Sequence, residues 1–306
     1  MDFLAILIGL GPMIGWGLFP TISSKIGGKP SNQILGATLG GFIFAVALVL
    51  IRGLSIPTGI DLILAVISGL GWGFGQIMQF KGFKLVGSSR IMPITTAFQL
   101  ILTSLWGVFI LGNWGGMLGK LIGLLALVVI IIGATFTAWT ENQSSKNDKV
   151  FLKKAIILQL IGALGYLVYS AAPQIVTMPS MQAIIPGLQP MDGAHAFLPQ
   201  TIGMVIFAII YSLFNLKKEN VFLESVSYKQ ILAGLSQGFG MLMYLISAQP
   251  NMNGLATAFV LGQMAVLVST LTGIYVLHQK RTQKEMLFTV VGLILIVGAS
   301  AITAFL

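Results

Sequence analysis

Amide and aromatic side chains recur on one face of an otherwise apolar segment, residues 62–80. Trp72, Gln76 and Gln79 are spaced i, i+4 and i+7, so an α-helix would bring all three to one side. Amides donate and accept hydrogen bonds, and flat rings cover apolar surfaces. This combination is typical of sites for neutral, hydroxyl-rich molecules such as sugars. The alternative is a structural role, because Gln and Thr also form hydrogen bonds between membrane helices.

The same residue types occur in five further apolar segments. Thr95 and Thr96 lie in the segment 91–111, close to Gln99, and Gln237 and Tyr244 are seven residues apart in the segment 231–248. The candidate binding residues are Trp16, Trp72, Gln76, Gln79, Thr95, Gln99, Tyr166, Gln237, Tyr244 and Gln263. None carries a formal charge. The sequence therefore predicts an uncharged polar cavity.

Residues that most catalytic and metal sites require are scarce. There is no cysteine, and the two histidines, His195 and His278, are far apart in the sequence. The eight acidic residues all lie outside the apolar segments. An exporter of cationic drugs would be expected to keep an acidic residue within one of these segments. We expect neither an enzyme nor a metal site nor a cofactor.

Composition and the apolar segments predict an all-α membrane protein in a lipid bilayer. The 306 residues are 56% hydrophobic and 8% charged, with a mean hydropathy of +0.94. Ten continuously apolar runs are each close to the ~20 residues that a helix needs to cross the hydrocarbon. The predicted spans are residues 3–22, 34–51, 62–80, 91–111, 121–139, 155–172, 197–214, 231–248, 255–277 and 286–306.

The cations are distributed unevenly over the connections between these spans. Fifteen of the 17 Lys and Arg residues fall in alternate connections, and only Arg52 and Lys120 fall in the others. Because Lys and Arg favour the cytoplasmic side, the cation-rich connections are predicted inside and both termini outside. The net charge of +9 thus reflects the orientation of the chain in the membrane. We therefore expect no nucleic-acid partner.

The two halves of the chain resemble each other. Residues 63–75 are similar to 231–243, and residues 103–112 are similar to 269–278. Five spans in each half would give the halves opposite orientations in the membrane, an inverted repeat of the kind that supports alternating access. The expected organisation is a first repeat, 1–139, a cytoplasmic linker, 140–154, and a second repeat, 155–306.

Glycine and proline are concentrated in the first span, where residues 8–20 read IGLGPMIGWGLFP. An offset of 150 residues matches Gly15 and Trp16 to Gly165 and Tyr166. Glycine permits close helix approach and proline permits bending, so Gly11, Pro12, Gly15 and Gly165 are predicted hinge or packing positions. Ordinary small-residue packing is an equally good explanation.

Several stretches together resemble the glucose/ribose porter family of the drug/metabolite transporter superfamily, in particular its ribose uptake branch. They are GLGPMIGWGLFPT (9–21), GWGFGQ (71–76), LVGSSRIMPITTAFQL (85–100), SLWGVFILGNW (104–114), YSAAPQ (169–174) and YLISAQPNMNGLATAF (244–259). The resemblance implies a ten-helix importer of a neutral monosaccharide in the bacterial plasma membrane, coupled to protons. Ribose is the favoured substrate.

Five points stay open at this level: the substrate, the function, the coupling ion, the role of Arg90 and the role of one connection. Glucose is an alternative substrate, and a membrane sensor or subunit without transport is an alternative function. No carboxylate lies within a predicted span, so the candidate residues for proton coupling are Asp61 and Glu285 at span ends. Facilitated diffusion without proton coupling is the alternative. Arg90 either reaches the substrate or anchors a helix at the cytoplasmic surface. The connection 177–196 is longer than the family pattern and is either a cap over the cavity or an unstructured insert.

Overall fold

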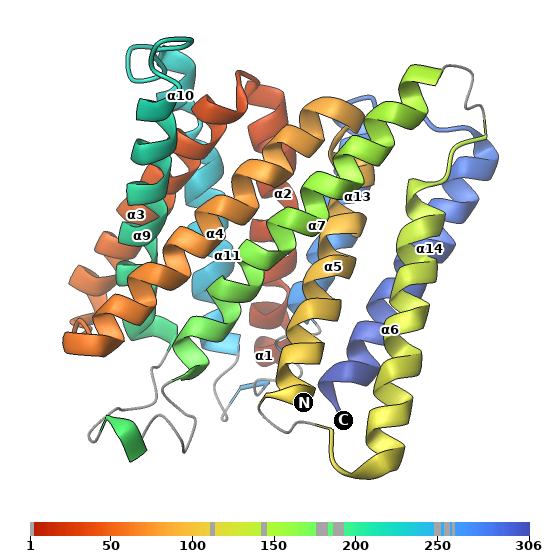
Figure 1. Ribbon diagram of the computed structural model, residues 1–306, viewed down its shortest axis with the longest axis horizontal. Helices are drawn as coiled ribbons and strands as arrows, with labels where there is room; N and C mark the ends of the chain where they lie inside the picture. Colours follow the sequence, from red (N-terminus) through yellow and green to blue (C-terminus); the bar gives the residue numbers. More distant parts are fainter. Residues whose placement is uncertain are drawn as a thin grey trace.

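The computed structural model describes residues 3–110, 114–141, 146–175, 183–185, 193–247, 252–253, 258 and 261–306. These residues form helices and connections, with no strand among them. The helices are α1 (Phe3–Gly9), α2 (Gly11–Ile26), α3 (Pro30–Arg52), α4 (Gly59–Val86), α5 (Ser88–Phe109), α6 (Gly116–Ala138), α7 (Lys146–Ile175), α9 (Gly193–Phe214), α10 (Ser225–Lys229), α11 (Ile231–Ser247), α13 (Ala265–Tyr275) and α14 (Gln283–Ala304). They form one elongated bundle (Figure 1).

Eight helical segments are long and apolar enough to cross a membrane. They begin with the combined segment Leu4–Ile26 and continue with α3, α4, α5, α6, α7, α9 and α14. Two shorter apolar helices, α11 and Leu261–Tyr275, lie where the eighth and ninth spans were predicted. The all-helical membrane architecture is therefore confirmed. Residues 146–154, expected in the linker, form the first turns of α7.

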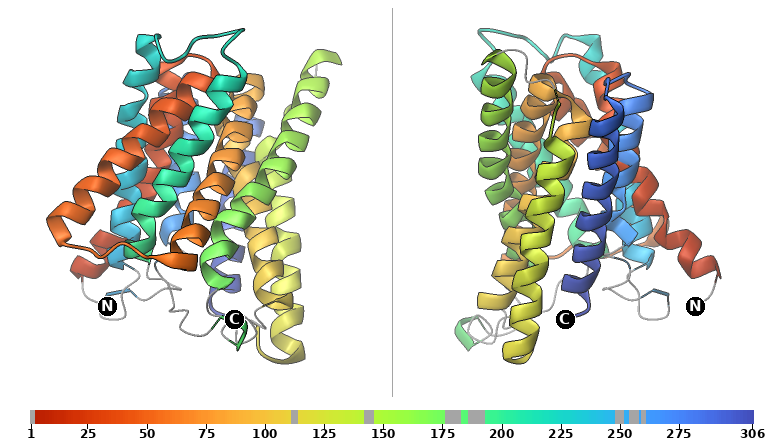
Figure 2. Two further views of the ribbon diagram at one scale, coloured as in Figure 1. Left: turned by 60° about the vertical axis from the view of Figure 1, so that its left-hand side comes forward. Right: turned by 90° about the vertical axis from the view of Figure 1, so that its right-hand side faces the viewer.

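The first predicted span consists of two helices that meet at Leu10. Pro12 stands at the start of α2, where its missing N–H leaves the carbonyl of Ile8 without the usual helical partner. The chain bends there, and α1 projects away from the bundle (Figure 2). A methyl group on Gly11 would lie 2.4 Å from the side chain of Met243, so this bend is packed against α11.

Helices from the two halves of the sequence are interleaved. α4 packs on α7 and α9, α11 packs on α2 and α3, and α6 pairs with α14 at one side of the bundle (Figures 1 and 2). Two of these crossings depend on glycine. A methyl group on Gly15 would lie 2.5 Å from the backbone of Gly240, and one on Gly165 would lie 2.5 Å from the carbonyl oxygen of Gly71. These backbones can approach because no side chain separates them.

The connections predicted to be cation-rich all lie at one end of the bundle, at the top of Figure 1, and both chain ends lie at the other. We call the former the cation-rich end. An ion pair there joins the two halves, since Lys29 Nζ lies 2.9 Å from Glu224 Oε1. A second ion pair joins the second half to the connection between the halves, since Lys284 Nζ lies 2.7 Å from Glu141 Oε1. The same end is thus both the most basic part of the molecule and a place where the halves are tied together.

Candidate functional site

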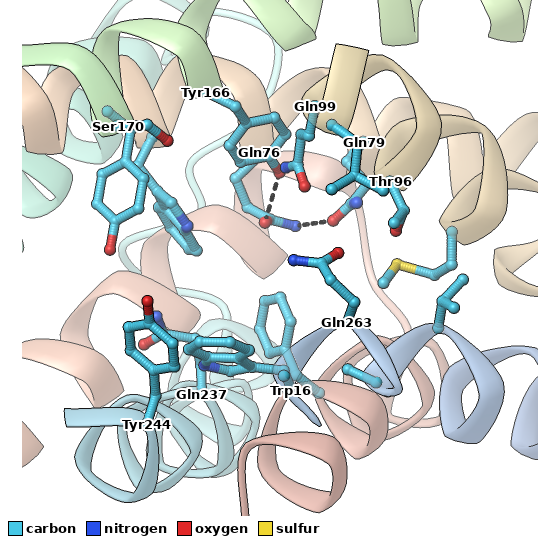
Figure 3. Close-up of a pocket in the computed structure, with 18 of the residues that line it drawn as sticks. Trp16, Gln76, Gln79, Thr96, Gln99, Tyr166, Ser170, Gln237, Tyr244 and Gln263 are labelled. Carbon is cyan, nitrogen blue, oxygen red and sulfur yellow. Dashed lines mark hydrogen bonds between the residues drawn. The ribbon is translucent and has the colours of Figure 1, made fainter. Parts of the chain in front are cut away.

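A cavity of about 300 Å³ lies inside the bundle between α2, α4, α5, α7, α11 and the segment leading into α13. Its lining residues are Trp16, Phe19, Trp72, Gln76, Gln79, Met92, Thr96, Gln99, Leu100, Thr103, Tyr166, Tyr169, Ser170, Gln237, Met241, Tyr244, Gly262, Gln263, Ala265 and Val266. Gln76, Gln79 and Gln99 lie on one side of the space, and Gln237 lies on the other side, beside the rings of Tyr244 and Trp16 (Figure 3). This volume is at the lower end of the range of small-molecule sites, ~300–1,000 Å³.

Nine of the ten candidate residues predicted from the sequence line this single cavity. Thr95 does not. Its hydroxyl lies 2.8 Å from Gln159 Oε1 and 2.9 Å from the carbonyl oxygen of Ile91, so it joins α5 to α7. The next residue, Thr96, lines the cavity instead, because successive helical side chains point about 100° apart.

Gln76 is held in place by two hydrogen bonds. Its Nε2 donates to Gln79 Oε1 at 2.8 Å, as expected for side chains three residues apart on a helix, and its Oε1 accepts from the Tyr166 hydroxyl at 2.9 Å (Figure 3). All three side chains are at least 95% buried. Tyr166 comes from α7, so the glycine-mediated approach of α4 and α7 positions this amide.

Aromatic rings from both halves face the same space. The centroids of Trp16 on α2 and Tyr244 on α11 are 5.4 Å apart, and those of Phe19 and Trp72 are 6.5 Å apart. Both distances fall within the range of favourable ring contacts. Gly240 makes room for the indole, because a methyl group there would lie 2.5 Å from Trp16.

The amides inside the bundle separate into two groups. Gln159, Gln200 and Gln230 donate to atoms of other helices or connections, which is the structural role that glutamine also plays between membrane helices. Gln99, Gln237 and Gln263 line the cavity and form no hydrogen bond with the residues that the structure describes. Their donors and acceptors are available to a ligand.

Comparison with known proteins identifies the family. A family model described as "Sugar transport protein" matches residues 7–306. The chain belongs to this sugar transport family. A protein of Staphylococcus epidermidis (strain ATCC 12228 / FDA PCI 1200) is 57% identical over the full length of both chains, and one of Staphylococcus aureus (strain Mu50 / ATCC 700699) is 54% identical, also over both full lengths. Both carry the name "Putative ribose uptake protein RbsU".

A solved crystal structure has the same fold at 17% sequence identity. It covers 99% of this chain and 96% of its own, with a TM-score of 0.61. The family model and the two Staphylococcus relatives confirm the family resemblance seen in the sequence, and this family is one of transporters rather than enzymes.

The cavity of this sugar transport protein has an uncharged lining. The two carboxylates that are candidates for proton coupling lie at helix ends: Asp61 in the first turn of α4, Glu285 in the first turn of α14. Glu285 accepts hydrogen bonds from the backbone N–H groups of Thr282 and Glu141, at 3.2 and 3.0 Å. Arg90 lies in the first turn of α5 and does not line the cavity.

Several lining residues were not among the predicted candidates. Tyr169 and Ser170 follow Tyr166 on α7, and Thr103 lies one turn beyond Gln99 on α5. Their spacing at i+3 and i+4 is the signal that could have identified them. Met92 and Met241 have the same spacing, four residues before Thr96 and four after Gln237, but spacing does not identify them, because an apolar residue in a membrane helix can face lipid equally well. The connection 177–196, for which a cap and an insert were the alternatives, lies largely outside the described residues.

Proposed function

We propose that this protein imports a neutral monosaccharide, with ribose as its substrate, through the cavity by alternating access. The observation that carries the proposal is the composition of the cavity wall. The free amides of Gln99, Gln237 and Gln263 line the same uncharged space as the rings of Trp16 and Tyr244. Sugar hydroxyls need such donors and acceptors, and the apolar faces of the sugar ring need flat aromatic surfaces.

The arrangement of the lining supports an inverted repeat of two five-helix units. Trp16 and Phe19 on α2 correspond to Tyr166 and Tyr169 on α7 at an offset of 150 residues. Trp72, Gln76 and Gln79 on α4 correspond to Gln237, Met241 and Tyr244 on α11 at an offset of 165. This register differs by three residues from the sequence match of 63–75 with 231–243, and it rests on the glycine contacts, since Gly75 packs on Gly165 as Gly240 packs on Gly15. Equivalent positions of the two halves thus meet around one central site, as alternating access requires.

The interleaved packing supports the same symmetry. α4 packs on α7 as α11 packs on α2, and α4 packs on α9 as α11 packs on α3. If the two repeats are exchanged, the α4–α7 contact becomes the α11–α2 contact, and the α4–α9 contact becomes the α11–α3 contact. A rocking motion of one half against the other would then expose the cavity to the two ends of the bundle in turn.

Orientation follows from the charge distribution. The cation-rich end is proposed to face the cytoplasm of a bacterial cell, which places both termini outside. The ion pairs Lys29–Glu224 and Lys284–Glu141 would then lie at the cytoplasmic end of the transport path.

The choice of ribose rests on the names of the Staphylococcus relatives and on the family. Coupling to protons is part of the proposal and rests on the family resemblance. Since the described cavity lining has no carboxylate, Asp61 and Glu285 at the helix ends are the proposed proton acceptors.

An uptake assay in cells that lack native pentose uptake tests the proposal. Cells that express this chain should accumulate labelled ribose with saturable kinetics, excess glucose should compete weakly, and a protonophore should abolish accumulation. Normal membrane insertion without uptake of either sugar would indicate a sensor. Saturable equilibration that a protonophore does not change would indicate facilitated diffusion.

A further inference from the structure

A second hollow lies outside the central cavity, between α5, α6 and the first turns of α7. We call it the α5–α6–α7 groove. Its volume is about 290 Å³, and its walls are almost entirely apolar, with Phe98 and Ile101 on α5, Trp139 just after α6 and Leu152 on α7. Ile131 on its rim is 51% exposed, so the groove faces the lipid. Such a surface suits a hydrocarbon chain.

The groove runs toward the cation-rich end, where Arg90 stands on the same face of α5. Arg90, Ile94, Ala97, Phe98 and Ile101 follow one another at i, i+4, i+7, i+8 and i+11, and the last four line the groove. The Arg90 guanidinium is half-buried and has no hydrogen bond or ion pair within the part of the chain that the structure describes. A half-buried cation without a partner is costly unless an anion approaches it.

Arg281 reaches the same region from the connection between α13 and α14. Its guanidinium donates to the carbonyl oxygens of Thr137 and Trp139, at 3.1 and 3.3 Å, at the C-terminal end of α6. Trp139 also lines the groove, so Arg281 is directly beside it. Burial, together with the charge of Arg90, lowers the pKa of Arg281 to about 10, although Glu285 opposes this effect. Arg281 therefore remains charged at neutral pH.

Two acidic residues, Glu285 and Asp148, lie close enough to interact electrostatically with Arg90. Both carboxylate oxygens of Glu285 accept backbone N–H groups, and among the described residues neither arginine lies within 4.0 Å of it. Asp148, in the first turn of α7, also interacts electrostatically with Arg90. Two half-buried arginines, Arg90 and Arg281, thus lie beside the α5–α6–α7 groove at the cation-rich end.

We propose that the α5–α6–α7 groove binds one anionic phospholipid, with its phosphate at Arg90 and Arg281 and an acyl chain along α5 and α6. Basic pockets between membrane helices on the cytoplasmic side recognise anionic headgroups in this way. The apolar walls and the lipid-facing rim favour a membrane lipid over a free anion. This site is separate from the sugar cavity and does not depend on the transported substrate.

The test uses the full chain purified in detergent and compares phosphatidylglycerol with phosphatidylcholine of identical acyl chains. Native mass spectrometry counts the retained lipid, and thermal unfolding reports its stabilising effect. We expect phosphatidylglycerol to bind more tightly and to raise the melting temperature more. Arg90→Gln should weaken phosphatidylglycerol binding about tenfold, as expected for the loss of one charge-assisted contact, while Arg90→Lys should retain most of the preference.

Two further variants separate the headgroup from the acyl chain. Arg52→Gln makes the same change at an exposed arginine of the opposite end and should leave binding unchanged. Thr135→Trp fills the exposed side of the groove and should weaken binding of the lipid. The proposal is overturned by equal binding of the two lipids, by an equal loss in Arg52→Gln, by full binding in Thr135→Trp, or by inorganic phosphate displacing the lipid completely.

Discussion

The Tyr166 hydroxyl donates a hydrogen bond to Oε1 of Gln76 at 2.9 Å, across the crossing of α7 and α4. This contact joins the two halves of the sequence at the cavity wall. It fixes the orientation of the Gln76 amide, whose Nε2 is then directed to Gln79 Oε1. The Nε2 group of Gln79 forms no hydrogen bond with any described residue. It is therefore available to donate a hydrogen bond to a ligand.

Gln76→Ala should lower sugar uptake while leaving expression intact. The substitution frees Gln79 to rotate and removes one amide from the site. Loss of about 1–1.5 kcal/mol of hydrogen bonding corresponds to a roughly five- to tenfold rise in the KM for uptake. Tyr166→Phe removes only the hydroxyl and should have a smaller effect. Reduced expression with unchanged uptake per molecule would instead indicate that Gln76 serves only to hold helices together.

Gln237 and Gln230 form a matched pair for the two roles of glutamine. Gln237 lines the cavity, whereas Gln230 donates to the carbonyl oxygens of Ser23 and Gly27 at 2.9 and 2.8 Å. Gln237→Ala should raise the KM with little change in melting temperature. Gln230→Ala should lower the free energy of unfolding by about 1–3 kcal/mol with little change in KM. If Gln237→Ala lowered the melting temperature without changing the KM, Gln237 would not be a substrate-binding residue.

Alanine at Gly15 or Gly165 should destabilise the protein. Each new methyl group would lie 2.5 Å from the backbone of a neighbouring helix, a clash that side-chain rotation cannot relieve. We expect a loss of about 1–3 kcal/mol, measured as a lower melting temperature in detergent. Gly298→Ala is the control, because its methyl group would meet nothing within 4 Å on α14. Equal effects at all three positions would mean that the close approach is unimportant.

The Lys29–Glu224 pair predicts a dependence of stability on pH. The hydrogen bond from Lys29, assisted by one from Asn32, lowers the pKa of Glu224 below its ordinary value of 4.5. Stability from this carboxylate is therefore present above pH 4.5 and is lost as the pH falls through the folded pKa. The same contact raises the pKa of Lys29 above 10.5, so its contribution is lost only as the pH rises through that higher value.

Glu224→Gln should consequently lower the melting temperature at pH 7 and have no effect at a pH well below 4.5. The Lys29 and Glu224 side chains are 41% and 34% exposed, so solvent screens the pair, and the difference at pH 7 should be small and should shrink in high salt. Lys229→Gln, at an exposed lysine of the same connection, is the control. A difference between the parent and Glu224→Gln that persists in acid would show that charge pairing is not its cause.

Orientation can be measured with single cysteines, because the chain contains none of its own. Ile56→Cys lies in the connection between α3 and α4, at the end of the bundle that holds both termini, and Ile56 is 49% exposed. Lys217→Cys lies at the cation-rich end. A membrane-impermeant thiol reagent added to intact cells should label Ile56→Cys and not Lys217→Cys. The reverse pattern would invert the proposed topology.

Much of the fold could be predicted from the sequence because the bilayer restricts what a chain can do. A continuously apolar run near 20 residues must be helical, and the pattern of Lys and Arg is sufficient to sort the connections into two sets, one for each end of the bundle. The bend at Leu10 lies beside Gly11 and Pro12, which the sequence marked as hinge or packing positions. The two shorter helices, α11 and 261–275, could not be derived in this way. Helix length within a bundle depends on neighbouring helices, which can satisfy backbone groups that lipid cannot.

The candidate site was predictable to the extent that helical periodicity decides it. Trp72, Gln76 and Gln79 had to share a face if residues 62–80 were helical, and they do. Thr95 and Thr96 show the limit, since both are small, polar and adjacent in sequence. The position of α7, with Gln159 beside Thr95, determines which of the two hydroxyls reaches the cavity.

The sequence alone determined that this chain is a helical membrane protein of a sugar transport family with uncharged polar groups at membrane depth, because those properties follow from composition and local spacing. Only the tertiary structure decided that glutamines such as Gln237 face an open cavity while Gln159, Gln200 and Gln230 bind neighbouring helices. All four are buried amides within or next to apolar segments. They differ in what lies within hydrogen-bonding distance, which is a property of packing between segments far apart in the chain.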